Sequence, residues 1–177
     1  MDVNNLWHSC RELFGSTARV DYAQILEKVR SNGFAKVSRQ VRPVAYTITA
    51  PHRRVSADGR VREEGSRNTR FLATLRRLGY EVKTRHMKYT KADDKPFRTD
   101  WDVGITVEVL DRLKDYDTLI LASGDGDYVP LLKQLQKAGK RVEVYTFKNS
   151  TSQLLYDQAD NLVYLGDDAI YHVKGSA

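Results

Sequence analysis

The stretch from Thr118 to Pro130 constrains this chain most, because an apolar run there stops at a turn that carries two carboxylates. Residues 119–122 are Leu-Ile-Leu-Ala, which is typical of a short strand buried on both faces. Two glycines in the turn allow the backbone to change direction sharply, and leucines at helical spacing follow within residues 128–138. The pattern predicts a strand, a turn and a helix, with the two carboxylates at the carboxyl end of the strand. Open α/β sheets bind their ligands at this end.

Strands and helices alternate along the rest of the chain. We expect helices over residues 6–14, 21–33, 69–78, 101–113 and 151–158, and strands over residues 37–49, 80–89, 142–147 and 161–165. For the helix over 101–113 the spacing predicts a buried stripe of Val103, Val107, Leu110 and Leu113. This order predicts an α/β fold of three layers, in which a central, mostly parallel sheet is flanked by helices. We expect one domain over residues 1–166, followed by a C-terminal extension over residues 167–177.

Composition limits the class of protein. Cys10 is the single cysteine, so a chain of this sequence can form neither an internal disulfide framework nor a thiolate zinc site. Apolar stretches are too short to cross a bilayer, and polar residues follow Met1 directly. These features predict a cytoplasmic protein with no membrane partner.

The positive charge is concentrated in one segment. The whole chain has a net charge of +6, but residues 52–98 alone have 14 Lys and Arg against 6 Asp and Glu. Residues 50–68 and 90–98 have no apolar period, so we expect basic loop insertions there, with a hairpin near residues 57–59 as one option. They are either phosphate-binding elements or merely solvated loops. On charge alone, the candidate nucleic-acid contacts are Arg53, Arg54, Arg60, Arg62, Arg67, Lys95 and Arg98.

Four acids are expected to meet at one end of the sheet: Asp2, Asp102, Asp125 and Asp127. Converging carboxylates repel one another unless a cation lies between them, and an all-oxygen ligand set favours Mg²⁺ or Mn²⁺. Such ions activate water and stabilise charge on a transferring phosphoryl group. Each acid also has an ordinary interpretation as a helix cap or a turn residue, and Asp2 as a terminal residue.

Three further polar residues accompany the acids. Asn5 either orients a water or phosphate oxygen or caps the first helix. Ser123 is either a ligand or a turn former, and Asp100 is either an accessory acid or a helix cap, with the cap favoured.

The motifs Asp2-Val-Asn-Asn, Asp100-Trp-Asp-Val-Gly and Ser123-Gly-Asp-Gly-Asp-Tyr-Val-Pro resemble the NYN domain family, in particular its LabA-like, DUF88-type members within the PIN-like nuclease superfamily. The resemblance implies a three-layer PIN-like (Rossmann-like) fold and a Mg²⁺- or Mn²⁺-dependent nuclease that hydrolyses RNA, single-stranded or structured. It makes the four acids the metal-binding residues, with Asn5 and Ser123 as polar members of the site.

The first strand departs from that resemblance. Only Met1 precedes Asp2, so either the chain starts further upstream or most of the central first strand is missing. A missing strand would leave neighbouring strands with unpaired backbone groups. Three functions are compatible with these residues. They are a metal-dependent endoribonuclease, a non-catalytic RNA-binding or regulatory module of the same fold, and a metal-dependent phosphatase or nucleotide hydrolase, for which the sequence has no phosphate-cradling glycine-rich loop. A homodimer is compatible with each of them.

Overall fold

The computed structural model describes residues 1–31, 40–49, 51–55, 61–66, 68–89, 96–97 and 100–173. The first half of the chain contains α1 (Val3–Phe14), β1 (Ala18–Val20), α2 (Tyr22–Ser31), β2 (Val44–Thr49), β3 (Pro51–Val55), β4 (Val61–Ser66), α3 (Thr69–Arg77) and β5 (Glu81–His86). The second half contains β6 (Lys88–Tyr89), β7 (Pro96–Phe97), α4 (Asp102–Asp111), β8 (Thr118–Ala122), η1 (Gly126–Tyr128), α5 (Val129–Lys137), β9 (Arg141–Phe147), η2 (Lys148–Ser150), α6 (Gln153–Gln158), β10 (Asn161–Leu165), η3 (Asp167–Ala169) and β11 (Ile170–His172).

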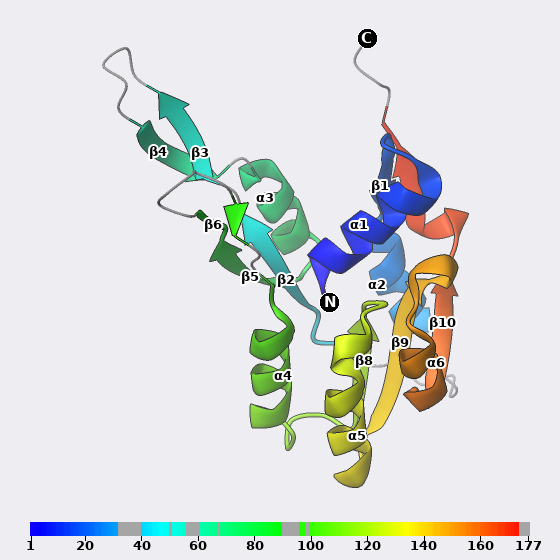
Figure 1. Ribbon diagram of the computed structural model, residues 1–177. Coiled ribbons are helices and arrows are strands. Elements are labelled where there is room, and N and C mark those ends of the chain that lie inside the picture. Colours follow the sequence, from blue (N-terminus) through cyan, green and yellow to red (C-terminus); the bar gives the residue numbers. More distant parts are fainter. Residues whose placement is uncertain are drawn as a thin grey trace.

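Parallel strands form the centre of the molecule, with helices around them (Figure 1). One group has the order β10-β9-β8, and the second group is the pair β2-β5. Apolar residues pack on both sides of these strands. One core joins α1, α2 and α3, and the other joins α4, α5 and α6. The predicted α/β fold, with a parallel sheet flanked by helices, is confirmed.

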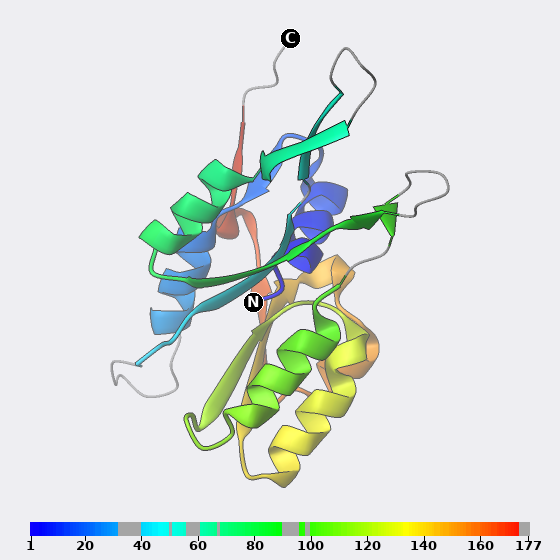
Figure 2. The same cartoon turned by 90° about the vertical axis from the view of Figure 1, so that its left-hand side faces the viewer.

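Met1 and Asp2 connect the two groups of strands, and the chain start lies between them in Figure 2. The backbone N–H of Asp2 donates to the carbonyl of Ala122 at 3.1 Å on the β8 side. On the β2 side, the Tyr46 N–H donates to the Met1 carbonyl at 3.0 Å, and the Met1 α-amino group donates to the Val44 carbonyl at 2.9 Å. These bonds hold Met1 and Asp2 between β2 and β8 and bring Asp2 to the carboxyl end of β8.

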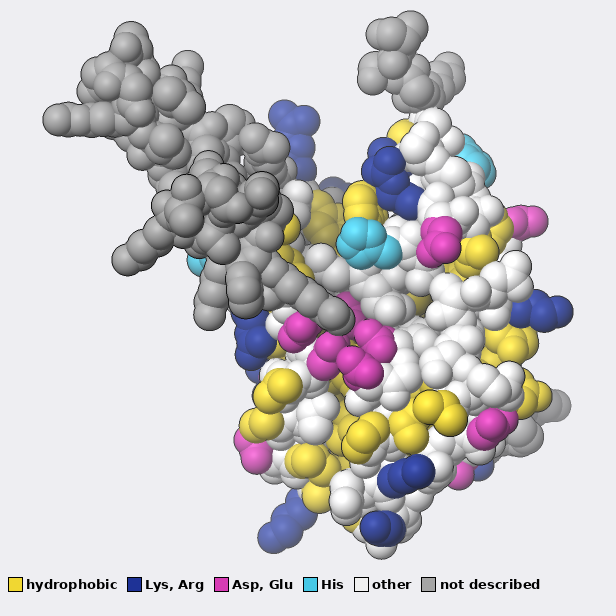
Figure 3. Space-filling view, viewed as in Figure 1, with side chains coloured by type: hydrophobic (Ala, Val, Ile, Leu, Met, Phe, Trp, Pro, Cys, Tyr) yellow, Lys and Arg dark blue, Asp and Glu magenta, His cyan; other side chains and the backbone are white. Residues whose placement is uncertain are grey.

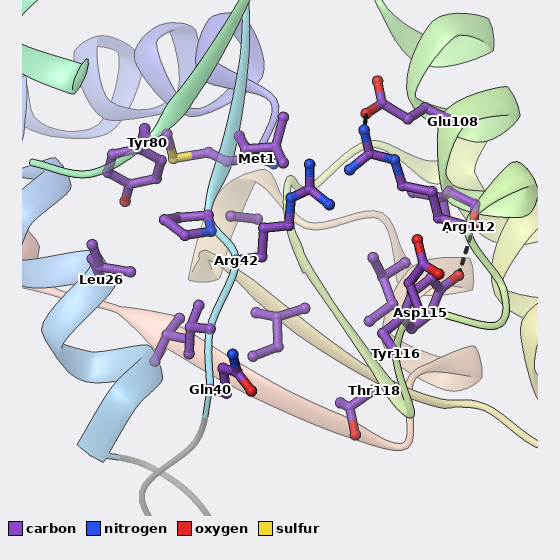
Figure 4. A pocket seen from close by; sticks show the side chains of 18 of the residues that line it. Met1, Leu26, Gln40, Arg42, Tyr80, Glu108, Arg112, Asp115, Tyr116 and Thr118 are labelled. Carbon is purple, nitrogen blue, oxygen red and sulfur yellow. Dashed lines mark hydrogen bonds and ion pairs between the residues drawn. The ribbon is translucent and has the colours of Figure 1, made fainter.

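A cavity of about 560 Å³ adjoins Met1 where β2 and β8 are not bridged. Figure 4 shows side chains that line it, which are apolar around Leu26 and charged at Arg42 and Asp115. Thr118 also lines it.

Several predicted elements need correction. Residues 50–68 were expected to form a loop, but β3 and β4 pair in antiparallel fashion there; the optional hairpin is the better description. Within the predicted extension, β11 pairs with β1, an unpredicted strand whose partner lies some 150 residues away in the chain. The stripe predicted for α4 was wrong in part, because Val103 and Val107 are 70% and 51% exposed while Ile105 is buried.

Among the residues described here, no helix combines the length and apolar character needed to span a lipid bilayer.

Candidate metal centre

The turn after β8 holds two of the predicted acids in fixed positions. Asp125 is the N-cap of the short helix η1, and its side chain accepts a hydrogen bond from the backbone N–H of Asp127 at 3.0 Å. Ser123 is fully buried, and its Oγ accepts from the Asp125 N–H at 3.2 Å. Ser123 thus acts as a turn former in this geometry. The turn presents the Asp127 side chain to solvent beside Asp125.

Gly124 is required by a close approach of another segment. A Cβ atom at this position would lie 2.3 Å from the Ser150 carbonyl oxygen and 2.8 Å from Thr146 Oγ1. The Gly124 carbonyl also accepts from the Ser152 N–H at 3.0 Å. On the other side, Asn5 Oδ1 accepts from the Gly124 N–H at 2.9 Å. The turn is therefore held between α1 and the segment that leads into α6, which keeps its two carboxylates in place.

Three carboxylates converge at this edge of the sheet. One oxygen atom from each of Asp102, Asp125 and Asp127 lies within 4.8 Å of the others. Asp102 is the first residue of α4, where the partial positive charge of the helix N-terminus stabilises an anion. Figure 3 shows acidic side chains gathered in one patch on this face. This spacing suits a shared cation because carboxylate oxygens bind Mg²⁺ or Mn²⁺ at roughly 2 Å from the ion.

Asp2 lies behind this group rather than within it. Its side chain is 6% exposed and caps α1, because Oδ1 accepts from the Asn5 N–H at 3.1 Å. Asp2 Oδ2 accepts from the Tyr128 hydroxyl at 3.2 Å, and the same hydroxyl lies 3.0 Å from Asp102 Oδ1. Tyr128 is fully buried. Its hydroxyl group lies between the two acids, and its single hydrogen is shared between the two carboxylates.

Sequence reasoning missed Tyr128. A tyrosine that begins an amphipathic helix looks like any core aromatic, and its apolar ring does pack in the core around Leu131 and Leu132. The signal that could have identified it is its position directly after Asp127, on a helix that starts at the acidic turn. A buried tyrosine hydroxyl needs a polar partner, and the nearest acceptors at such a place are carboxylates.

Burial governs the electrostatics of the site. It raises the pKa of Asp2, while the hydrogen bonds from Asn5 and Tyr128 oppose this shift. It also raises the pKa of Asp102, with the Tyr128 hydrogen bond opposing and the charges of Asp2 and Asp125 adding to the rise. The pKa of Tyr128 is raised by burial and by the two neighbouring carboxylates, so its hydroxyl stays protonated and donates. For both acids, desolvation by burial is the largest cause of the shift and outweighs the hydrogen bond from Tyr128.

The remaining polar candidates occupy supporting positions. The Asn5 carbonyl oxygen binds the acidic turn through Gly124, and Asp2 rather than Asn5 caps α1. The prediction that Asp100 caps the next helix was wrong, because Trp101 is the N-cap of α4. Asp100 is exposed, and its backbone carbonyl accepts from Arg85 Nη1 at 2.9 Å.

The predicted basic contacts are largely outside the described part of the chain. Arg60, Arg67, Lys95 and Arg98 are not among the described residues. Arg53 and Arg54 lie in β3 and Arg62 in β4, and their side chains are outside the description. In register, Arg53 pairs with Glu63 and Arg54 with Arg62. Their contact with phosphates stays a prediction.

The family described as the NYN domain matches this chain over residues 1–166. The low amplitude and bright protein LabA of Synechococcus elongatus is 25% identical over 101 residues, which are 55% of this chain and 54% of that protein. The match therefore spans about half the length of LabA. A crystal structure of a protein of unknown function from Vibrio parahaemolyticus is also similar. It has 29% sequence identity and a TM-score of 0.70, over 96% of this chain and 91% of that chain.

Proposed function

Because the chain belongs to the NYN domain family, of PIN-like nuclease character, we propose that it is a ribonuclease that depends on Mg²⁺ or Mn²⁺. The observation that carries the proposal is the approach of Asp102, Asp125 and Asp127 to within 4.8 Å of one another. Three carboxylates at this spacing repel one another in the absence of a cation. No ion pair joins any of them to a Lys or Arg whose side chain is described.

The donor set fits a hard divalent ion. Asp102, Asp125 and Asp127 offer carboxylate oxygens alone, and Cys10 is buried elsewhere, on the core-facing side of α1. When bound there, Mg²⁺ or Mn²⁺ would supply a water of lowered pKa and would stabilise negative charge on a phosphodiester.

The chain's own residues would keep this site in the ionised, open arrangement. Tyr128 donates its hydroxyl hydrogen to the Asp2 and Asp102 pair, which favours the charged form of both carboxylates. Asn5 fixes the Gly124 amide and so the orientation of the acidic turn. Asp127, which is exposed and bonded only through its backbone N–H within the described residues, would face the substrate side.

RNA as the substrate is supported by the family and by the net charge of the segment over residues 52–98. Basic segments neutralise phosphates without regard to base sequence. We therefore expect weak sequence preference, with cleavage directed by the position of the strand in the site.

A non-catalytic RNA-binding module is the second candidate, and the position of Asp2 favours it. Both oxygens of Asp2 accept hydrogen bonds from the protein, and Asp2 is not among the three converging acids. If the chemistry needs Asp2 as a ligand, the remaining three acids would not support cleavage. RNA would then bind in a salt-dependent manner without being cut.

The test is cleavage of a 5′-labelled single-stranded RNA in Mn²⁺ by wild type and by Asp125→Asn, each purified in parallel. Asp117→Asn is the matched control, because Asp117 is an exposed aspartate at the opposite end of β8. We expect cleavage by wild type and Asp117→Asn, its loss on chelation of the metal, and a reduction of at least about a hundredfold in Asp125→Asn. Equal rates for wild type and Asp125→Asn would reject the proposal.

A further inference from the structure

Arg85 lies beside the acidic cluster in a fixed position. Its guanidinium carbon is 4.2 Å from the centroid of the Trp101 ring, and its Nη1 donates to the Asp100 carbonyl at 2.9 Å. Asp100 and Trp101 are the two residues before Asp102 in the chain. A guanidinium stacked on an indole and hydrogen-bonded on one side has little rotational freedom, so Arg85 presents its remaining N–H groups from a defined place.

Trp101 is itself held by the sheet. Its indole Nε1 donates to the Thr47 carbonyl at 2.9 Å, and its ring contacts Tyr46 edge-on with 5.2 Å between centroids. A Cβ atom on Gly104 would lie 2.7 Å from Arg85 Nη2 and 2.7 Å from Trp101 Cε3. The absence of a side chain at Gly104 therefore lets the stacked pair rest directly on the first turn of α4.

An open groove extends from this pair along α4. Its lining includes Arg85, Trp101, Gly104, Val103 and Val107, and its volume is about 510 Å³. Val103 and Val107 are 70% and 51% exposed and lie about one turn apart on α4. Figure 3 shows basic and apolar side chains bordering the acidic patch on the side of α4.

Of the three described cations that line this groove, Arg85 forms no ion pair with a described carboxylate. Lys83 and Arg112, which also line it, both form ion pairs with Glu108, at 2.6 Å and 3.0 Å. No carboxylate among the described side chains lies within ion-pair distance of Arg85. An unpaired, stacked guanidinium is suited to a phosphate group, and the valines next to it offer an apolar surface to a base.

We propose that this groove, which we call the α4 groove, binds the single-stranded RNA segment next to the scissile phosphate. Arg85 contacts a phosphate of that segment, and Val103 and Val107 contact its bases. The proposal rests on the proposed ribonuclease function and deepens it by assigning a path for the strand. It also explains how an RNA approaches three carboxylates that would otherwise repel it, because Arg85 supplies a positive charge at the edge of the cluster.

Binding is measured without cleavage, in the Asp125→Asn background with chelator, by fluorescence anisotropy of a labelled single-stranded RNA over a range of salt concentrations. Arg85→Ala should weaken binding and lower the slope of log K against log salt by about 0.7, the value for one phosphate contact on a single strand. Arg85→Lys should keep the salt slope and still bind more weakly, because the planar stack is lost. Arg30→Ala removes an exposed cation from α2, which belongs to the other core, and serves as control.

Two further variants test the apolar wall. Val103→Asp and Val107→Asp change exposed side chains and should each weaken RNA binding at least about threefold, whereas Leu154→Asp on α6, also exposed, should not. If Arg85→Ala and Arg30→Ala have the same affinity and salt slope while the parent still binds RNA, the α4 groove is refuted and the ribonuclease proposal stands. If wild type neither binds nor cuts RNA, both proposals fail.

Discussion

Replacing Tyr128 by phenylalanine removes one buried hydroxyl and tests how the acidic site is held together. The hydroxyl is the hydrogen-bond donor between Asp2 Oδ2, at 3.2 Å, and Asp102 Oδ1, at 3.0 Å. Hydrogen bonds to charged groups contribute about 1.5–3 kcal/mol, so we expect Tyr128→Phe to lower the free energy of unfolding by about 2 kcal/mol at pH 8. For a protein of this length, that loss corresponds to a fall in Tm of roughly 4–8 °C.

The loss should depend on pH in a defined direction. Burial raises the pKa of Asp2 and of Asp102, and the Tyr128 hydrogen bond opposes both shifts. Without that bond, the pKa values of Asp2 and Asp102 in the folded state should rise further above their values in the unfolded state. The difference in stability between Tyr128→Phe and wild type should therefore grow as pH rises above the ordinary aspartate range and shrink towards pH 4.

The matched control is Tyr80→Phe, because the Tyr80 hydroxyl is buried and donates to a neutral acceptor, the Tyr22 carbonyl, at 2.9 Å. We expect this variant to lose about 1 kcal/mol, with little change between pH 4 and pH 8. Urea unfolding followed by circular dichroism at the two pH values, with chelator present, measures both differences. A loss in Tyr128→Phe that is the same at both pH values would refute the proposed electrostatic role of the hydroxyl.

Two more substitutions should separate the function of the site from its stability. Asp102→Asn should abolish cleavage. It should also raise the Tm of the metal-free protein at pH 8 but not at pH 4, because burial disfavours the charged form of Asp102. An unchanged Tm at pH 8 would contradict this. Gly124→Ala should lower the free energy of unfolding by about 1–3 kcal/mol, since its Cβ would meet the Ser150 carbonyl oxygen at 2.3 Å. Gly166→Ala, whose nearest atom would be 3.6 Å away, should change it by no more than about 0.5 kcal/mol, and equal losses in the two would show that the close approach is unimportant.

The apolar pattern predicted the second half of the fold well. β8, α5 and β9 each have an apolar run or a helical stripe bounded by a glycine or a charged turn, so the local signals and the tertiary packing agree. The same agreement places Asp125 and Asp127 at the carboxyl end of β8.

The face of α4 was harder to predict because valine and isoleucine alternate within Asp102–Asp111. This spacing fits more than one helical face, and the packing of Ile105 against the second core decides between them. The pair β1 and β11 was missed for two reasons. Strands of three residues carry almost no periodic signal, and these two strands lie near opposite ends of the chain. The bridge made by Tyr128 and the stacking of Arg85 on Trp101 are likewise long-range contacts, which spacing along the chain does not reveal.

Binding of Mn²⁺ tests the central claim most directly, because the claim is that Asp102, Asp125 and Asp127 hold a divalent ion. The electron paramagnetic resonance signal of free Mn²⁺, titrated with protein, reports the bound fraction. Asp127→Asn is the informative variant, since this exposed side chain has no hydrogen-bond partner among the described residues and its replacement should leave the fold intact. We predict that wild type and Asp117→Asn bind Mn²⁺ and that Asp127→Asn binds at least about tenfold more weakly. Equal binding by wild type and Asp127→Asn would contradict the account.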